Sequence, residues 1–264
     1  MNSHRRMKQI GYVASLVVVL VIFFSLIVPF SVRLFAEKTP VVTPSPYQPI
    51  KLEQEAIIVH QRPDGSRTAD IVAQVRNPNS RAGLSSYVVT FKVLNPAGEE
   101  ILSHTEKTHL LPGALQYVVA IDVPIPVEAA IGRLQVLLPA EGDLTFQPLP
   151  NGLNPPEFQT LLQGRSQRDI AGIPIETQTG LVTNASTFDW EKVEVVAVGL
   201  NAQRQIIAVG KTFLGRLLVG EQRQFTVTWP TTGEPIRNVI ALPSTDMFNE
   251  ENLVETLGNS GTLR

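Results

Sequence analysis

The chain of 264 residues carries 22 basic and 24 acidic side chains, which gives a formal net charge of −2 at pH 7. It contains no cysteine, so thiol chemistry and Cys-ligated zinc or iron–sulfur sites are excluded. Its 20 prolines and 18 glycines, together with 11 phenylalanines, favour an all-β protein with many turns. The lack of cysteine also favours a bacterial cell-envelope protein over a disulfide-rich secreted domain.

The N-terminal region contains an uncharged apolar run of 23 residues, from Ile10 to Val32. As a helix this run would extend about 35 Å, whereas the hydrocarbon core of a bilayer is about 30 Å thick. The run is longer than the apolar region of a cleaved signal peptide, and no small-residue cleavage site follows it. We therefore predict a transmembrane signal-anchor helix over residues 10–35, through which the chain contacts the lipid bilayer.

Three cations, Arg5, Arg6 and Lys8, precede the apolar run, and no acidic residue does. By the positive-inside rule, residues 1–9 are expected in the cytoplasm and the bulk of the chain outside the cell membrane. Without these three cations the chain keeps 19 basic against 24 acidic side chains, which argues against nucleic acid as a partner of the exported part.

Residues 36–52 are predicted to form a stalk between the membrane and the first folded domain. Four prolines fall between residues 39 and 50. Chain of this composition is extended and semi-rigid, because proline fixes φ and cannot continue a helix.

Short apolar runs separated by turn signals predict an antiparallel β-sandwich over residues 53–148. The clearest strand is Tyr87–Val93, in which every second residue, starting with Tyr87, is apolar and lies on one face. Turn signals such as Pro63-Asp64-Gly65 separate the runs.

Residues 149–169 are predicted to be a linker with one short helix. A Pro-Pro-Glu sequence at residues 155–157 is typical of a helix start, and the apolar residues that follow would share one helix face. The rest of the chain is expected to form a second β-sandwich and a polar tail, over residues 170–248 and 249–264.

The second half of the chain repeats landmarks of the first half, in the same order, at an offset of 104 to 108 residues. The matched pairs are Val75–Asn79 with Val182–Ser186, Tyr87–Leu94 with Val193–Leu200, Asn95 with Asn201, Leu110–Gly113 with Leu217–Gly220, Tyr117 with Phe225, and Leu134–Pro139 with Asn238–Pro243. Such a series predicts a tandem repeat. In each repeat we expect the asparagine after the strand to bond its own backbone and the glycine to adopt a positive φ.

The segment Val182–Ser186, followed by a strand, a turn, Leu217, Gly220 and Phe225, resembles the FxLYD-type β-sandwich of bacterial envelope proteins. The segment Val75–Asn79 is also similar to the water-stress (WHy) type of sandwich. Both types are immunoglobulin-like. The resemblance implies an all-β fold of two tandem immunoglobulin-like antiparallel β-sandwiches, preceded by the N-terminal transmembrane α-helix. Such domains are generally non-catalytic adhesive or scaffolding modules, so it implies no site residues.

The sequence contains neither of the hydrolase signatures G-x-S-x-G and H-E-x-x-H. His104 and His109 flank Glu106, which makes a metal site conceivable, but strand parity places the two histidines on opposite faces. We therefore predict a protein that is not an enzyme, with no catalytic, cofactor-binding or metal-binding residues and no cofactor.

Three residues are candidates for contact with a partner protein: Trp190, Arg165 and Arg168. Trp190 precedes the strand Val193–Leu200 and is either an exposed contact or packed at a sheet edge. The two arginines of the predicted linker either bind carboxylates of a partner or are solvated.

These features together predict a single-pass protein of the cell membrane with a non-enzymatic role as a scaffold or protein–protein interaction module of the bacterial envelope, for example in a secretion, pilus or surface assembly. Its expected partner is another envelope protein. The alternative is an extracytoplasmic ligand-binding or sensor module with a site between the two sandwiches. A cleft lined by Phe158, Leu161 and Arg165 would favour that alternative.

Overall fold

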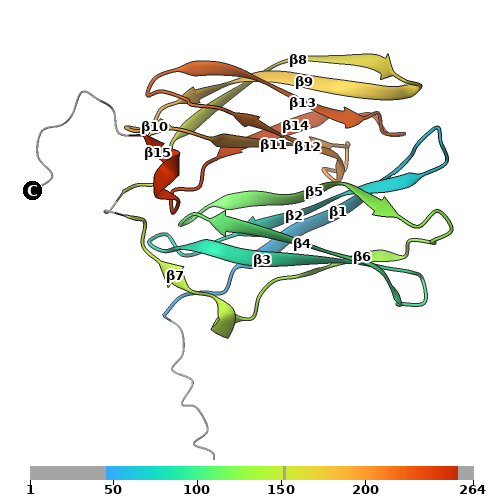
Figure 1. The fold of residues 1–264 in the computed structure, drawn as a ribbon, viewed down its shortest axis with the longest axis horizontal. Coiled ribbons are helices and arrows are strands. Elements are labelled where there is room, and N and C mark those ends of the chain that lie inside the picture. Colours follow the sequence, from blue (N-terminus) through green and yellow to red (C-terminus); the bar gives the residue numbers. More distant parts are fainter. Residues whose placement is uncertain (1–45, 151–152, 255–264) are drawn as a thin grey trace, which may run out of the picture. The chain divides into compact units, whose positions relative to one another are not determined.

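The computed structural model describes residues 46–150 and 153–254, and this part of the chain is built from β-strands (Figure 1). It contains fifteen strands and two 3₁₀ turns, and the sheet pairs are antiparallel. This confirms the predicted all-β class. The described part includes no helix that is long and apolar enough to cross a bilayer. The predicted cytoplasmic segment 1–9 and transmembrane helix 10–35 lie outside the described residues.

The first half of the described chain builds two sheets. In one sheet β2 lies between β1 and β5, and in the other β3 lies between β4 and β6 and also pairs with β7. The strands are β1 (Lys51–Gln61), β2 (Arg67–Arg76), β3 (Gly83–Leu94), β4 (Glu100–Leu110), β5 (Leu115–Ile125), β6 (Arg133–Leu137) and β7 (Phe146–Gln147). As predicted for β3, Tyr87, Val89, Phe91 and Val93 are all buried and pack in the core between the two sheets.

The second half repeats this strand order. One sheet has the order β13-β9-β8 and the other β12-β11-β14, which match β5-β2-β1 and β4-β3-β6. The strands are β8 (Phe158–Ile170), β9 (Ile173–Asn184), β10 (Asp189–Trp190), β11 (Val193–Leu200), β12 (Ile206–Leu214), β13 (Gln222–Pro230), β14 (Asn238–Ser244) and β15 (Leu253–Val254). Each half of the described chain is therefore a sandwich of two sheets with the same connectivity.

A buried asparagine occupies the same place in both sandwiches. Asn77 donates from Nδ2 to the backbone oxygens of Ala82 and Leu111, and Asn184 donates in the same way to Phe188 and Leu217. Each side chain is at most 1% exposed, so it satisfies buried carbonyl groups that water cannot reach. The loop after β2 or β9 is thereby tied to the turn before β5 or β13.

The turns also follow the sequence-based expectation. Asn95 and Asn201 each accept a hydrogen bond at Oδ1 from the backbone N–H four residues later. Gly113 and Gly220 have φ values of +66° and +71°, a region that a residue without a Cβ adopts at little cost. These local contacts explain why the same landmarks recur in the two halves.

The short helix predicted in the linker 149–169 is wrong. Residues from Phe158 to Ile170 form β8, which pairs antiparallel with β9 along its length. Phe158 and Leu162 are partly buried against the second core, and their even spacing places them on one face of a strand as well as on one face of a helix. Sheet pairing decided between the two, and the second sandwich begins at residue 158 instead of residue 170.

The predicted stalk and tail both contribute to the described fold at their inner ends. Ile50 is buried, the ring of Tyr47 lies 4.9 Å from that of Phe146, and Asn79 bonds the backbone of Gln48 in both directions. Residues 249–254 continue through a 3₁₀ turn into β15, which pairs with β10. The remainder of each predicted segment, residues 36–45 and 255–264, lies outside the described residues.

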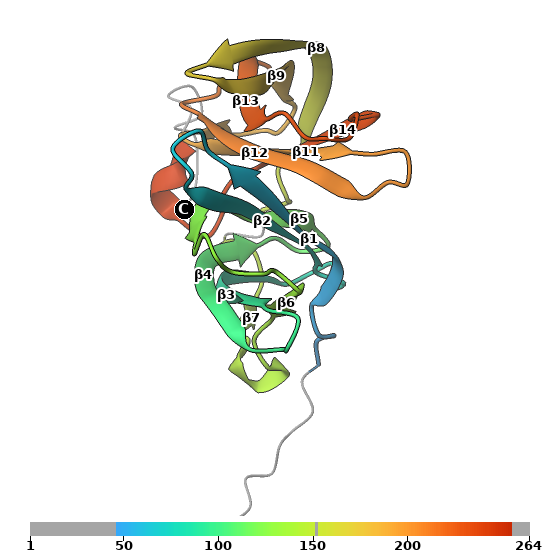
Figure 2. The same ribbon diagram turned by 90° about the vertical axis from the view of Figure 1, so that its right-hand side faces the viewer.

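Three apolar clusters hold the four sheets in one stack. The first core lies inside the first sandwich, the second inside the second sandwich, and a third lies where sheet β1-β2-β5 faces sheet β12-β11-β14 (Figures 1 and 2). We call the third cluster the internal interface. Its buried members are Val72, Tyr117, Val119, Val196, Val198, Leu200, Ile206 and Val209. Because full burial of one such side chain is worth about 1.5–3 kcal/mol, this contact couples the two sandwiches firmly.

A β-bulge reverses the alternation of β5 near one end of the internal interface. The β2–β5 register shifts between Ala69 and Ile71, so that Asp70 faces an extra residue on β5. Before the bulge Val118 and Ala120 point into the first core, and after it Val123 and Ile125 do. One inserted residue changes the parity of a strand, so Val119 on one side of the bulge and Val123 on the other point to opposite faces.

The register also corrects the match of Tyr117 with Phe225. Gln74 pairs with Tyr117, whereas the equivalent Leu181 pairs with Gln224. Tyr117 therefore corresponds to Gln224, and Val118 corresponds to Phe225. Tyr117 follows its glycine one residue sooner than Phe225 does, and in a strand that difference moves a side chain to the opposite face.

Candidate functional site

Two hollows border the internal interface. The larger has a volume of about 680 Å³ and lies between β3–β4 of the first sandwich and the strand ends and C-terminal turn of the second. The smaller has a volume of about 540 Å³ and lies between the β1–β2 hairpin with the bulge of β5 and the ends of β9 and β13. Both volumes fall in the range of small-molecule sites.

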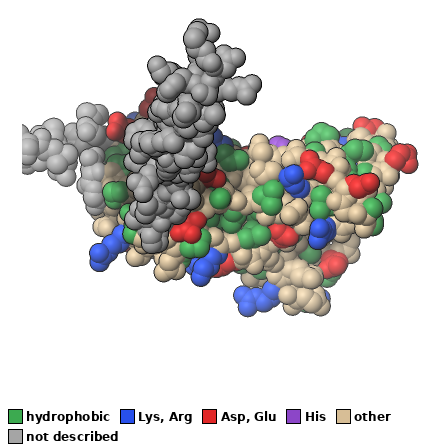
Figure 3. Space-filling model, turned by 90° about the horizontal axis from the view of Figure 1, so that it is seen from below, with side chains coloured by type: hydrophobic (Ala, Val, Ile, Leu, Met, Phe, Trp, Pro, Cys, Tyr) green, Lys and Arg blue, Asp and Glu red, His purple; other side chains and the backbone are tan. Residues whose placement is uncertain are grey.

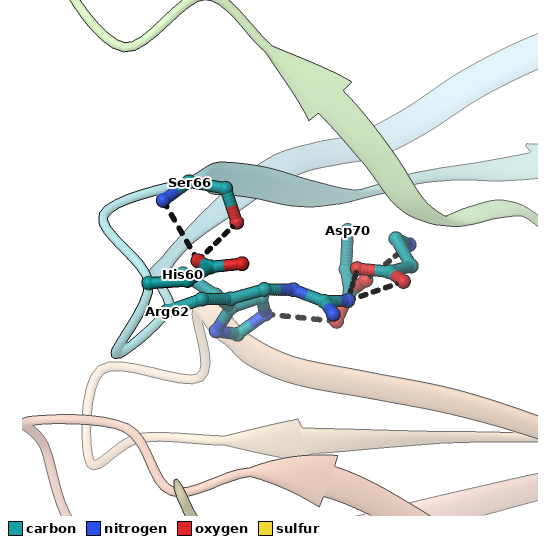
Figure 4. Close-up of polar contacts among 6 residues, drawn as sticks. His60, Arg62, Ser66 and Asp70 are labelled. Carbon is teal, nitrogen blue, oxygen red and sulfur yellow. Dashed lines mark hydrogen bonds and ion pairs between the residues drawn. The ribbon is translucent and has the colours of Figure 1, made fainter.

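A histidine–aspartate pair stands at the wall of the smaller hollow (Figure 4). His60 on β1 lies 2.9 Å, at Nε2, from Oδ2 of Asp70 on β2. The Asp70 side chain is only 5% exposed, and its Oδ1 accepts a hydrogen bond of 2.8 Å from the backbone N–H of Asp122. Both carboxylate oxygens of this buried charge are therefore occupied, as burial of a carboxylate requires.

Asp122 extends the pair to a cation. It adopts a φ of +59°, a left-handed region that few residues other than glycine, asparagine and aspartate adopt, and it sits at the bulge of β5. Its carboxylate is bound by the guanidinium of Arg62, which comes from the turn between β1 and β2. Desolvation alone would raise the pKa of the Asp122 carboxyl, but hydrogen bonds from Arg62 and Thr68 outweigh it and lower that pKa.

The β1–β2 turn that carries Arg62 is ordered by its own contacts. Asp64 accepts hydrogen bonds from the backbone N–H and the hydroxyl of Ser66, at 2.9 and 2.6 Å (Figure 4). These bonds lower the pKa of the Asp64 carboxyl. Gly65 completes the turn with a φ of +85°. The turn that the Pro63-Asp64-Gly65 sequence predicted thus positions Arg62 against Asp122.

Two buried polar atoms at the end of β13 have no hydrogen-bond partner among the described residues. They are Nε1 of Trp229 and Oγ1 of Thr231, on and just after β13, and both residues line the smaller hollow. Trp229 is 2% exposed and belongs to the second core. A buried donor without a partner costs about 1–3 kcal/mol, so these groups are unusual unless something else satisfies them.

The histidine–aspartate pair has the geometry of a base held by a carboxylate, but catalysis by nucleophilic attack needs a third group. No hydroxyl or thiol hydrogen-bonds to His60 in the part of the chain that the structure describes.

A second, partly buried histidine lines the larger hollow. His109, at the end of β4, has no partner for Nε2 within the described ranges. Burial lowers the pKa of His109, although the charge of Asp246 and the backbone of Thr245 oppose that shift. Burial also raises the pKa of Glu194 on β11, which lines the same hollow.

The histidines considered for a metal do not come together. His104 bonds Glu106 at 2.9 Å, whereas His109 lines the larger hollow. Over residues 46–150 and 153–254 there is no group of three or more His, Asp or Glu side chains arranged to hold a metal ion.

The three predicted partner-contact residues differ in exposure. Trp190 is 1% exposed, donates from Nε1 to Ser186 Oγ at 3.1 Å, and packs in the second core, so it is not a surface contact. It is buried because residues 249–254 return and β15 covers β10, a pairing that the sequence does not reveal. Arg165 and Arg168 are exposed on β8, where Arg165 also donates to the backbone oxygen of Ile236.

A cleft lined by Phe158, Leu161 and Arg165, which would favour the ligand-binding alternative, is not one of the two hollows described above. Phe158 faces the second core and Leu161 is 59% exposed on the outer side of β8. The predicted membrane-span residues Ile10 and Val32 and the topology residues Arg5, Arg6 and Lys8 lie outside the described residues.

Charges are mixed on the outer surface. On the face shown in Figure 3, basic and acidic side chains are interspersed, with small groups of apolar side chains between them. A face with this mixture carries no single-sign field that would attract a phosphate backbone.

Comparisons with known proteins do not show a family. No family model matches the chain, and no curated protein matches it. Among solved structures, the chain is similar to the crystal structure of red sea bream transglutaminase with a TM-score of 0.23 and 14% sequence identity, over 74% of this chain and 30% of that chain. The chain thus spans less than a third of that protein, and a likeness at this level carries no argument about activity.

Proposed function

We propose that this chain is a non-enzymatic interaction module of the bacterial cell envelope, anchored by the N-terminal helix over residues 10–35 and exposed outside the membrane. The observation that supports it best is the internal interface, which joins the two sandwiches through apolar side chains from both. A module held together in this way presents its outer sheet edges at fixed relative positions, which suits a scaffold more than a flexible tether.

We further propose that the two sandwiches are tandem immunoglobulin-like domains of the FxLYD or WHy type. The repeated strand order and the repeated buried asparagine support that reading. Fold alone does not assign a function, so the interaction role must be tested on the intact protein in its cell.

A suitable test is site-specific photocrosslinking with the full-length chain in living cells. A crosslinking amino acid at Leu161 or Arg168, both exposed on the edge strand β8, is expected to yield a discrete adduct with another envelope protein. The matched control is the same amino acid at Thr226, on the outer face of β13. If the crosslinking amino acid is placed at one exposed strand after another and no position yields an adduct, the scaffold role is contradicted.

Orientation is tested separately. If Arg5, Arg6 and Lys8 hold the N-terminus in the cytoplasm, protease added to spheroplasts will digest the chain from residue 51 onward. Complete protection of that part would show that the proposed topology is wrong.

A second candidate function is ligand binding at the margin of the internal interface. The specific observation in its favour is the smaller hollow, whose lining from both sandwiches includes the charged group of His60, Asp70, Asp122 and Arg62. A ligand that binds the folded state stabilises it. A melting temperature of the full-length chain that rises with the concentration of a compound would therefore identify that compound as a ligand.

A further inference from the structure

Strand β8 is an edge strand. In the described part of the chain it pairs with β9 alone, and it lies at the margin of sheet β13-β9-β8 (Figure 1). The carbonyl of Glu157, just before β8, accepts a hydrogen bond from the N–H of Ala185 on the β9 side. Because backbone groups alternate in direction along a strand, those of Phe158, Thr160 and Leu162 point away from β9. They form a row of donors and acceptors with which a further strand can pair.

The first part of this edge lacks the features that normally block pairing. Exposed edges are usually protected by charged side chains, prolines or bulges. Residues 158–164, with the sequence FQTLLQG, contain neither a charge nor a proline. A β-bulge between Leu162 and Arg165 closes the run at its far end. A partner strand is therefore expected to pair with residues 158–164 and not with the rest of β8.

The equivalent edge of the first sandwich has a contact within the chain. Leu161 pairs with Leu181 and Gln54 of β1 pairs with Gln74, and these two pairs occupy equivalent positions. Gln54 donates from Nε2 to the backbone oxygen of Arg204, in the β11–β12 turn of the second sandwich. Leu161 is 59% exposed, the largest exposed fraction of any large apolar side chain in the described ranges. The position that Gln54 uses for a contact inside the chain is thus open at Leu161.

The open run is complementary to a second copy of itself. When two β8 strands pair antiparallel about Leu161, this side chain lies directly opposite Leu161 of the other copy, and each covers the other. Gln159 then faces Gln163 of the other copy, and their side-chain amides can bond each other. Glu157 and Arg165, which bracket the run, have opposite signs, so antiparallel pairing brings unlike charges together at each end. A parallel pair would align like charges instead.

We propose that two copies of this chain associate through β8, which pairs antiparallel about Leu161 and joins two three-stranded sheets into one continuous sheet. Main-chain hydrogen bonds between Thr160 of one copy and Leu162 of the other flank the two-fold axis. This inference goes beyond the scaffold role and does not depend on it. In the crosslinking experiment, an adduct of twice the mass of the chain reports the dimer, and an adduct of another mass reports a scaffold partner.

A single cysteine provides the direct test, because the chain has none of its own. Opposite residues of a non-hydrogen-bonded antiparallel pair have Cα atoms about 4.5 Å apart, a separation that a disulfide can span. Full-length Leu161→Cys, held in detergent and oxidised with copper phenanthroline, is expected to form mainly a disulfide-linked dimer on a non-reducing gel. Thr226→Cys, exposed on the outer face of β13 in the same sheet, is the matched control and should stay monomeric.

Charge substitution tests the two-fold axis. Leu161→Lys and Leu161→Glu each place like charges opposite each other, so each is expected to weaken association of the full-length chain by about tenfold or more in sedimentation equilibrium. An equimolar mixture of the two variants pairs unlike charges and should recover the dimer. Because Leu161 is exposed, both variants should keep the urea midpoint of the parent chain, which shows that they are folded.

Three results would overturn the proposal. The first is a parent chain that stays monomeric and a Leu161→Cys variant that crosslinks no more than Thr226→Cys. The second is association that Leu161→Lys leaves unchanged, which would place the contact elsewhere, for example in residues 10–35. The third is a mixture of the Lys and Glu variants that does not recover the dimer. None of these results bears on the scaffold role, which adducts with other proteins decide.

Discussion

The two sandwiches share one strand order but differ in which of their outer faces is apolar. At equivalent positions on the outer face of β3 and β11, the first sandwich has Thr90 and Lys92 and the second has Val196 and Val198. Thr90 and Lys92 remain partly exposed, whereas both valines are buried in the internal interface. A change of side chain on one face therefore turned a solvent-facing sheet into a contact surface.

The opposite substitution occurs on the other pair of sheets. Tyr117 and Val119 on β5 are buried in the internal interface, and the equivalent residues on β13 are the exposed Gln224 and Thr226. The contact is thus heterologous: one face of the repeat meets a different face of the next. The two outer faces of the stack carry polar residues at these positions.

The largest loss of stability is expected from a charge in the internal interface at position 198, which is equivalent to position 92 of the first sandwich. Val198→Lys places in the second sandwich the residue that the first has at position 92, and it buries an uncompensated charge. We expect the free energy of unfolding of the full-length chain, measured with urea, to fall by about 3–5 kcal/mol.

The reciprocal variant, Lys92→Val, is the control. It removes only a partly exposed ion pair with Glu100, so a change of less than about 1 kcal/mol is expected. Similar losses for the two variants would mean that the internal interface does not stabilise the fold.

The next largest loss of stability is expected at the buried asparagine that the two sandwiches share. Asn77→Ala and Asn184→Ala each leave two buried carbonyl oxygens without their donor, and each is expected to lower the free energy of unfolding by about 2–3 kcal/mol. Asn95→Ala, in a more exposed turn, should cost less. A large loss for only one of the two buried asparagines would show that the shared contact is not equivalent.

The bulge is a feature that the second sandwich lacks, because β9 and β13 pair from Thr183 to Ile175 without a register shift. Asp70→Ala removes the group that binds His60 and the bulge backbone, and a loss of about 1–3 kcal/mol in urea unfolding is expected. Asp64→Ala, at the exposed tip of the same hairpin, should change stability by less than about 0.5 kcal/mol. Equal losses of unfolding free energy for Asp70→Ala and Asp64→Ala would show that the bulge does not depend on Asp70.

The smallest effect concerns pH. Because burial lowers the pKa of His109 below its usual 6.5, the unfolded chain takes up a proton before the folded chain does. The contribution of neutral His109 to the free energy of unfolding is therefore fully present above pH 6.5, and it is lost as the pH falls from 6.5 toward the lowered pKa. His109→Gln should flatten this part of the stability–pH curve, measured by urea unfolding at a series of pH values.

Much of the fold was predictable from local pattern. The alternation in Tyr87–Val93, the turn at Pro63-Asp64-Gly65 and the glycines at 113 and 220 report local physics, and the structure confirms each of them. The helix predicted after Pro156 failed because an apolar residue at every fourth position fits a strand face as well as a helix face, and only pairing with β9 decides between them.

The candidate site was less predictable. His60, Asp70 and Asp122 are separated by up to 62 residues and meet only because β1, β2 and β5 are neighbours and β5 carries a bulge. One signal was present: β11 is apolar on both faces from Val195 to Leu200, and a strand of that kind is covered on both sides. That signal indicates a second contact surface but not which sheet fills it.

The sequence by itself determined strands such as β3, the turns and the repeat, because each depends on the conformations and contacts of residues that are near one another along the chain. Only the tertiary structure decided which outer faces meet, where the bulge changes the parity of β5, and that Trp190 is covered by the returning C-terminal segment. Those outcomes depend on pairing and burial between residues far apart in the chain, which no local pattern encodes.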